Sequence, residues 1–146
     1  MKIPFLILGI LTVLIIVFIK MTYFSPQIPR AKINGHIFSL YLAKTSQEQA
    51  VGLAKFNKID KNRGMLFIFP KSDYYSFWMK NMKFPIDIIF INKHAVVDIF
   101  QNISVSKSNN LPIYTTHEKA DMVLEINSGL SKEYKIKTGD KVDINL

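Results

Sequence analysis

The chain has 146 residues, of which 49% are hydrophobic and 21% charged, so it suits one folded domain and excludes a globally disordered protein. It contains no cysteine, which excludes disulfides, thiolate metal sites, cysteine nucleophiles and lipid attachment through a cysteine. The formal net charge of +8 favours anionic partners such as an acidic envelope polymer or lipid headgroups.

The first predicted element is an apolar segment from Ile3 to Ile19, which lies between Lys2 and Lys20. Its seventeen residues would cover about 25 Å as a helix, close to the roughly 30 Å of a bilayer core. Because no small-x-small cleavage site follows, we expect residues 1–24 to be a transmembrane or signal-anchor helix rather than a cleaved signal peptide. The membrane is then a partner through residues 3–19.

A short linker is expected at residues 25–30, where Pro26 and Pro29 prevent the helix from continuing. The globular domain should occupy residues 31–146. Since short amino-terminal tails usually stay in the cytoplasm, we expect the domain on the extracytoplasmic side of the membrane. Cleavage of the first segment would instead make it a secreted protein.

The domain opens with a predicted hairpin, because Asn34-Gly35 separates two extended runs and suits a turn with positive φ. A short helix should follow from Thr45 to about Leu53, with Thr45 and Glu48 forming a capping box. The run from Gly64 to Pro70 is apolar at successive positions, which predicts a strand covered on both faces.

The remaining segments read as short strands separated by turns, with a helical turn or two near Leu130. Turn signals at intervals of about 8–12 residues are typical of all-β folds. We therefore predict a mainly β domain, an antiparallel β-sandwich or barrel of jelly-roll type with one or two short helices. The predicted strands of this part cover residues 74–80, 85–91, 96–100, 121–127 and 142–146.

Polar residues interrupt the apolar stretch from Phe77 to Phe90. If residues 81–84 form a hairpin loop, Trp78 lies opposite Asp87, and Lys80 lies diagonal to that carboxylate. One interpretation is a solvated ion pair worth about 0–1 kcal/mol. The other is a shallow binding site, in which the indole stacks on a ring while the charged groups orient it.

The same register assigns the side chains of these two segments to the core or to solvent. Phe77, Met79, Ile88 and Phe90 fall on a continuous apolar face and are expected in the core. Trp78 falls on the other face and should be at least partly exposed.

Several short motifs resemble the family called domain of unknown function 192, over roughly residues 33–144. They are GMLFIF, FWMKN, P-x-D-x-x-F, LEINSG, GDKV and an earlier Val51-Gly52-Leu53. The resemblance implies a mainly antiparallel β structure of jelly-roll or barrel type, often behind a signal sequence or anchor, and no established reaction. The family motif maps onto Gly52, Leu53, Gly64, Met65, Trp78, Met79, Lys80, Asn81, Pro85, Asp87, Glu125, Gly129, Gly139 and Asp140.

Two classes of function fit these observations. The first is a membrane-anchored binding or accessory module for an envelope glycan or another polar, ring-containing ligand, with Trp78, Lys80, Asn81, Asp87 and Glu125 as its ligand-binding residues. The alternative is a hydrolase of an envelope polymer that uses Asp87 and Glu125 as an acid–base pair. Glu125 also reads as a solvent-facing strand residue.

Other classes of site and partner have less support. His36, His94 and His117 lie far apart in the sequence, so we expect no metal site, and no motif demands a cofactor. The lysines are spread over several loops, which does not favour nucleic acid as a partner. The oligomeric state has no signal in the sequence.

Overall fold

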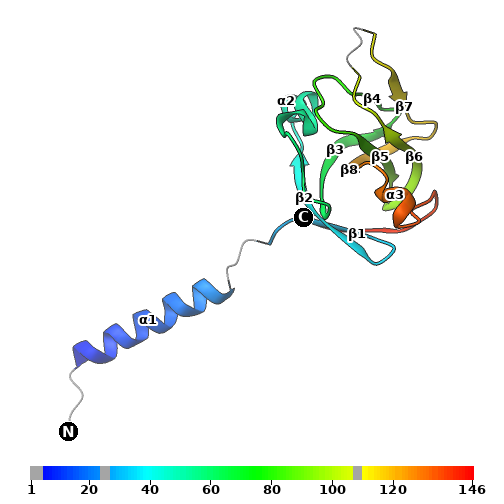
Figure 1. Cartoon of the computed structure of the whole chain (residues 1–146). Helices are drawn as coiled ribbons and strands as arrows, with labels where there is room; N and C mark the ends of the chain where they lie inside the picture. The colour runs from blue at the N-terminus through cyan, green and yellow to red at the C-terminus, as the bar shows by residue number, and fades with distance from the viewer. Residues whose placement is uncertain (1–4, 24–26, 107–109) are drawn as a thin grey trace.

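The computed structural model describes residues 5–23, 27–106 and 110–146 (Figure 1). The predicted anchor 1–24 and linker 25–30 therefore lie partly outside the described residues. The helices and strands are α1 Phe5–Tyr23, β1 Arg30–Ile33, β2 His36–Ala43, α2 Ser46–Val51, η1 Gly52–Lys55, β3 Arg63–Asp73, β4 Ser76–Trp78, β5 Ile86–Asn92, β6 Ala95–Ile103, β7 Ile113–Thr115, β8 Ala120–Asn127, α3 Leu130–Glu133 and β9 Val142–Asn145.

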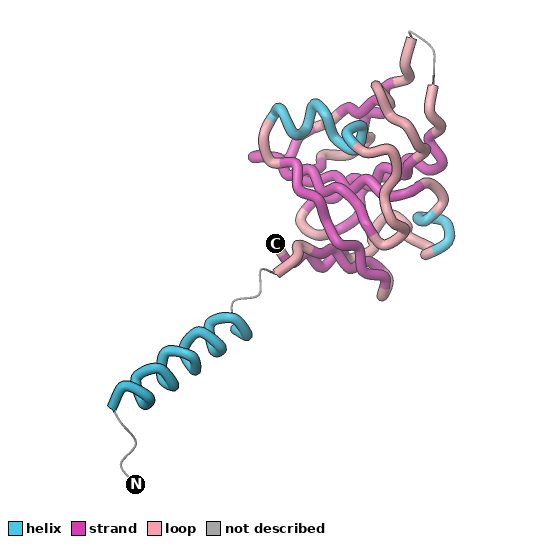
Figure 2. Tube along the Cα trace, turned by 60° about the vertical axis from the view of Figure 1, so that its left-hand side comes forward, coloured by secondary structure: helices cyan, strands magenta, loops and turns pink. Residues whose placement is uncertain are grey.

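One seven-stranded sheet forms the body of the domain, in the order β6-β5-β8-β3-β2-β1-β9. Its neighbouring strands are antiparallel except β2 and β3, which run parallel. The strands β4 and β7 pair separately as a two-stranded sheet. Figures 1 and 2 show the large sheet curled into a half-barrel. The prediction of a mainly β domain with few short helices is confirmed.

The first hairpin forms where the sequence predicts it. Asn34 and Gly35 have φ values of 49° and 83°, and Ile33 pairs with His36 across the turn. Positive φ is strained for most residues, but glycine and asparagine adopt it readily, so this pair fixes the register of β1 against β2.

The predicted capping box at the start of α2 is also present. The Glu48 backbone N–H donates to Thr45 Oγ1 at 3.2 Å, and the Thr45 N–H donates to Glu48 Oε2 at 2.9 Å. Two N–H groups at the helix start thereby gain partners that the helix itself does not offer. The chain continues from α2 into η1 through Gly52, so the helical segment ends close to the predicted position.

Both faces of the central strands β3 and β8 are apolar, which produces two packed clusters. Leu66 and its partner Leu124 belong to the first cluster, whereas Phe67 and its partner Val123 belong to the second. Successive side chains of a strand point to opposite faces, so burial of both faces requires cover on both sides. The prediction of a doubly covered strand therefore holds for the first half of β3.

The predicted hairpin between residues 74–80 and 85–91 is wrong. The strand β4 pairs with β7, where Trp78 lies opposite Ile113, and β5 pairs with β6 on one edge and β8 on the other. Residues 86–91 are all buried. Such a strand belongs in the interior of a sheet, so both of its edges are occupied and none is left for β4.

The burial predicted for these side chains agrees with the structure more closely than the predicted strand pairing does. Met79, Ile88 and Phe90 are buried, and Trp78 is 53% exposed. Phe77 is half-buried and packs against Phe67 and Phe90. Burial therefore followed the apolar pattern even though the strand partners differ.

The helix α1 precedes the β domain (Figure 1). Wherever its side chains are described, they are exposed. Within the described residues, no helix is both long and apolar enough to cross a membrane.

Candidate functional site

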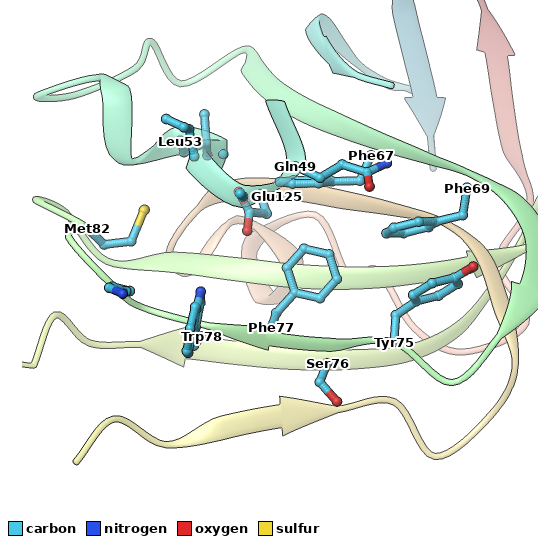
Figure 3. Close-up of a pocket in the computed structure, with 14 residues that line it drawn as sticks. Gln49, Leu53, Phe67, Phe69, Tyr75, Ser76, Phe77, Trp78, Met82 and Glu125 are labelled. Atoms are coloured by element: carbon cyan, nitrogen blue, oxygen red, sulfur yellow. The ribbon is translucent and has the colours of Figure 1, made fainter. Parts of the chain in front are cut away.

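A pocket of about 140 Å³ opens between the α2–η1 segment and the strands β3, β4 and β8 (Figure 3). Segments far apart in the sequence build it, because β3 and β8 are neighbours in the large sheet and β4 packs over them. Its lining residues are Gln49, Ala50, Val51, Gly52, Leu53, Phe67, Phe69, Tyr75, Ser76, Phe77, Trp78, Lys80, Met82 and Glu125.

Glu125 is the one carboxylate among the described residues that line this pocket. It lies on β8 between Met65 of β3 and Ile88 of β5, and it is 5% exposed. Figure 3 shows its carboxyl directed into the pocket toward Phe77. Its face of the sheet is covered by the α2–η1 segment and β4, so the interpretation of Glu125 as a solvent-facing residue is wrong.

The electrostatic state of Glu125 follows from that burial. Desolvation raises the pKa of its carboxyl to about 8, and a hydrogen bond from the Leu53 backbone N–H lowers the pKa by a smaller amount. The carboxyl is therefore mostly protonated at neutral pH. Its Oε2 has no hydrogen-bond partner among the described residues. A buried polar atom without a partner costs about 1–3 kcal/mol, and such atoms are rare in folded proteins.

Gly52 brings the backbone close to this carboxyl. Its φ of 54° and ψ of −144° are accessible essentially to glycine alone. A Cβ at this position would lie 3.2 Å from the Phe67 ring and 3.7 Å from Glu125 Oε2. The glycine thus keeps the pocket open beside the carboxyl.

Gln49 fixes α2 over the pocket. Its side-chain N–H groups donate to the backbone carbonyls of Ala43 and Ile68, at 3.3 and 3.0 Å. These two acceptors lie on β2 and β3, which pair in parallel. The helix is thereby held against the end of β2 and the middle of β3.

Aromatic rings of β3 and of the segment through β4 form one wall of the pocket. Phe69 and Tyr75 stack with centroids 3.6 Å apart, and Phe67 meets Phe77 edge-to-face at 5.0 Å. Contacts of this kind add about 0.5–1.5 kcal/mol beyond simple burial. The rings therefore brace one another and hold the wall in place without a ligand.

Trp78 and Lys80 lie at the mouth of the pocket. The Lys80 ammonium is 5.1 Å from the centroid of the Trp78 ring, within range of a cation–π interaction. Beside them is a second depression of about 350 Å³, which Lys55 and Asn81 also line. Asn81 has a φ of 60°, a conformation that asparagine tolerates better than most residues.

Asp87 lies away from this pocket. It is completely buried and accepts three backbone N–H groups, from Asn102 at 2.8 Å, Gly129 at 3.0 Å and Ser131 at 2.8 Å. The carboxylate thus holds the start of α3 against the end of β6. Of the five residues predicted for the site, Trp78, Lys80 and Glu125 line the pocket and Asn81 lines the adjoining depression.

The acid–base pair of the hydrolase hypothesis is not formed. Asp87 pairs with Ile126 across β5 and β8, whereas Glu125 pairs with Ile88. Directly paired residues point to the same face of a sheet and successive residues to opposite faces, so the two carboxyls project from opposite faces. In the part of the chain that the structure describes, no group of three or more acidic or histidine side chains is placed to hold a metal ion.

Most of the remaining lining residues carry no local signal in the sequence. Gly52 and Leu53 stood out as motif residues, but no spacing along the chain links them to Glu125. Gln49, Phe67 and Phe69 read as ordinary helix and core positions. Only the pairing of β3 with β8 and the packing of β4 over them bring these residues together.

Two solved structures resemble this chain. A protein of unknown function from Novosphingobium aromaticivorans DSM 12444 is 34% identical, with a TM-score of 0.72 over 78% of this chain and 83% of that one. A protein from Sinorhizobium meliloti 1021, named a "putative transcription regulator", is 27% identical, with a TM-score of 0.72 over 82% of this chain and 95% of that one. Among curated proteins, none matches the chain significantly.

The family comparison agrees with the motifs in the sequence. The model of domain of unknown function 192, described as an uncharacterized ACR, matches residues 29–144. That range contains the whole pocket described above. The chain therefore belongs to the family called domain of unknown function 192.

Proposed function

We propose that this protein is a binding or accessory module that holds a compact polar group of an envelope polymer, such as a glycan, in the pocket at Glu125. The observation that carries the proposal is the Glu125 carboxyl, which is buried, faces the pocket and has an Oε2 atom without a partner in the described part of the chain. A hydrogen bond from a ligand would offset the desolvation cost that folding leaves in place.

The mouth of the pocket supports the same function. The half-exposed indole of Trp78 offers apolar area to a ring, while Lys80 and Asn81 offer polar groups that orient it. Ligand sites commonly combine a mostly apolar lining with a few well-placed polar groups. Because the aromatic rings already pack against one another, ligand binding should cost little side-chain conformational entropy.

We also propose that residues 3–19 hold the module at a membrane, with the domain on the extracytoplasmic side. The support is the uncharged apolar sequence between Lys2 and Lys20. Resistance of the full chain to alkaline extraction from membranes, together with protease access from the outer side only, is the expected result. Release by alkali, or protection of the domain until the cytoplasm is opened, contradicts this assignment.

Tryptophan fluorescence tests the binding function directly, because Trp78 is the single tryptophan of the sequence. The full chain in a polyoxyethylene detergent is titrated with soluble envelope glycan fractions. A saturable change in Trp78 emission is expected. The change should weaken in Glu125→Gln and persist in Glu133→Gln, which alters an exposed carboxylate paired with Lys61. No response to any fraction would refute the function.

A further inference from the structure

The inner end of the pocket combines a carboxyl with aromatic rings. Glu125 projects between the α2–η1 side and the rings of Phe77 and Trp78, and Tyr75 stands farther along the same wall (Figure 3). Aromatic faces attract cations through the ring quadrupole, and enclosed aromatic sites recognise organic ammonium groups. A carboxylate beside such rings adds the opposite charge. This lining favours a positively charged group at the inner end.

The outer end carries the opposite character. The adjoining depression shares Ala50, Val51, Trp78 and Lys80 with the pocket, so the two hollows are continuous along one surface. Its remaining lining includes Lys55 and Asn81, and both lysines are exposed. Two ammonium groups and an amide beside a shallow hollow favour an anionic group there.

The geometry points to a zwitterionic ligand, with an organic ammonium group against Glu125 and the aromatic wall, and a phosphate or carboxylate at Lys80 and Lys55. This inference rests on the proposed function and names the chemistry of its ligand. Phosphocholine and phosphoethanolamine groups have this arrangement, whether they belong to a lipid headgroup or to a substituent on an envelope polymer.

A neutral sugar ring or a simple anion fits the two hollows less well. A neutral ring can use the protonated form of Glu125 but offers no anionic group to Lys80 or Lys55. A simple anion can use the lysines, but the aromatic wall and the carboxyl repel it. At the mouth, the Lys80 ammonium lies 5.1 Å from the centroid of the Trp78 ring, so a cation already lies over an aromatic face of this site.

Binding of a cation should release a proton from Glu125. With a pKa of about 8, about one Glu125 carboxyl in ten is ionised at pH 7. The affinity for a permanent cation should therefore rise about tenfold per pH unit below pH 8 and level off above it. The other titratable side chains facing the site are Tyr75 and Lys80 in the pocket and Lys55 beside it.

Four small probes separate the contributions of charge and shape. The full chain in polyoxyethylene detergent is titrated with phosphocholine, choline, the neutral isostere 3,3-dimethylbutanol, and inorganic phosphate, with Trp78 emission as the signal. Phosphocholine should bind more tightly than choline, and choline at least tenfold more tightly than its neutral isostere. Phosphate alone should bind weakest of the charged probes.

Two variants assign the two ends of the ligand. Glu125→Gln keeps the shape but removes the charge, and should weaken choline and phosphocholine at least tenfold and abolish the pH dependence. Lys80→Met should weaken phosphocholine while leaving choline unchanged or tighter. Glu133→Gln, the matched control, should change neither. Wild-type affinity for phosphocholine in Glu125→Gln, or equal affinity for choline and its isostere, overturns the inference.

The outcomes distinguish this inference from the proposed function. Saturable binding of neutral glycans without any binding of choline would support the proposed function but overturn the inference of a zwitterionic ligand. If neither neutral glycans nor choline bind, both the proposed function and the inference of a zwitterionic ligand are overturned. Reconstitution in phosphatidylcholine and phosphatidylglycerol vesicles then separates the sources. If the response to soluble phosphocholine is lost in phosphatidylcholine vesicles but kept in phosphatidylglycerol vesicles, the lipid headgroup occupies the site. An equal response in both kinds of vesicle supports a substituent on a polymer.

Discussion

Asp87 and Glu125 lie one register step apart on neighbouring strands, yet their carboxyls project from opposite faces of the sheet. Asp87 accepts three backbone N–H groups, whereas one oxygen of Glu125 has no partner among the described residues. Two carboxylates of similar burial therefore differ completely in role. Asp87 stabilises the fold, and Glu125 offers a hydrogen-bonding group to a ligand in the pocket.

Replacing Asp87 with asparagine should destabilise the protein by about 1–3 kcal/mol, because the amide can no longer accept all three N–H groups. Urea unfolding followed by circular dichroism measures this loss. Asp143→Asn, at an exposed carboxylate paired with Lys141, is the control and should leave the stability nearly unchanged. Equal stability of the two variants would show that the Asp87 contacts contribute nothing.

The stability of the wild-type protein should carry a pH signature of Glu125. Between pH 4.5 and pH 8 the folded protein keeps the Glu125 proton while the unfolded chain has released it. The unfolding free energy therefore falls as pH rises, by up to about 1.4 kcal/mol per unit, and levels off above pH 8. Glu125→Gln cannot titrate, so the difference between the two proteins isolates the effect. A difference that stays constant from pH 5 to pH 8 contradicts the raised pKa.

The sequence predicted the local features of the fold well. The Asn34-Gly35 turn and the Thr45–Glu48 capping box depend on a few neighbouring residues, and both formed as expected. The burial of Met79 and the exposure of Trp78 also followed from the apolar pattern.

The failures concern pairing between distant segments. An antiparallel hairpin between residues 74–80 and 85–91 places apolar side chains on one face and polar side chains on the other. However, β5 is buried on both faces and pairs with a strand on each edge, which leaves no edge for β4. Glu125 alternates with Leu124 and Ile126, so its face looked solvent-exposed. Its burial depends on α2 and β4, whose positions no local pattern encodes.

Gly52→Ala should destabilise the protein by about 1–3 kcal/mol and also reduce ligand affinity. The backbone conformation is strained for any residue with a Cβ, and that Cβ would press on the Phe67 ring. Gly139→Ala is a matched control, because Gly139 has a φ of 91° and open space around its Cβ position. It should cost stability but not affinity. Unchanged affinity in Gly52→Ala would contradict the position of the pocket.

Truncation of Phe77 should mainly reduce stability, whereas truncation of Trp78 should mainly reduce ligand affinity. Phe77→Ala removes a ring that packs against Phe67 and Phe90, and should cost about 3 kcal/mol of stability. Trp78→Ala removes a half-exposed ring and should cost less than about 1 kcal/mol while weakening ligand binding. Urea unfolding by circular dichroism and calorimetric titration measure the two effects. The reverse ranking of stability losses would be incompatible with the observed packing.

The titration of Glu125 itself tests the central claim most directly. Carbon-13 labelling of the four glutamates, with the Glu125 carboxyl signal assigned by its loss in Glu125→Gln, gives its midpoint by NMR. Without ligand the midpoint should lie near pH 8, and saturating phosphocholine should move it to lower pH as the ammonium stabilises the carboxylate. A midpoint near 4.5 without ligand would contradict a desolvated Glu125 in the pocket, and one near 8 that saturating phosphocholine leaves unchanged would contradict its contact with the ammonium group.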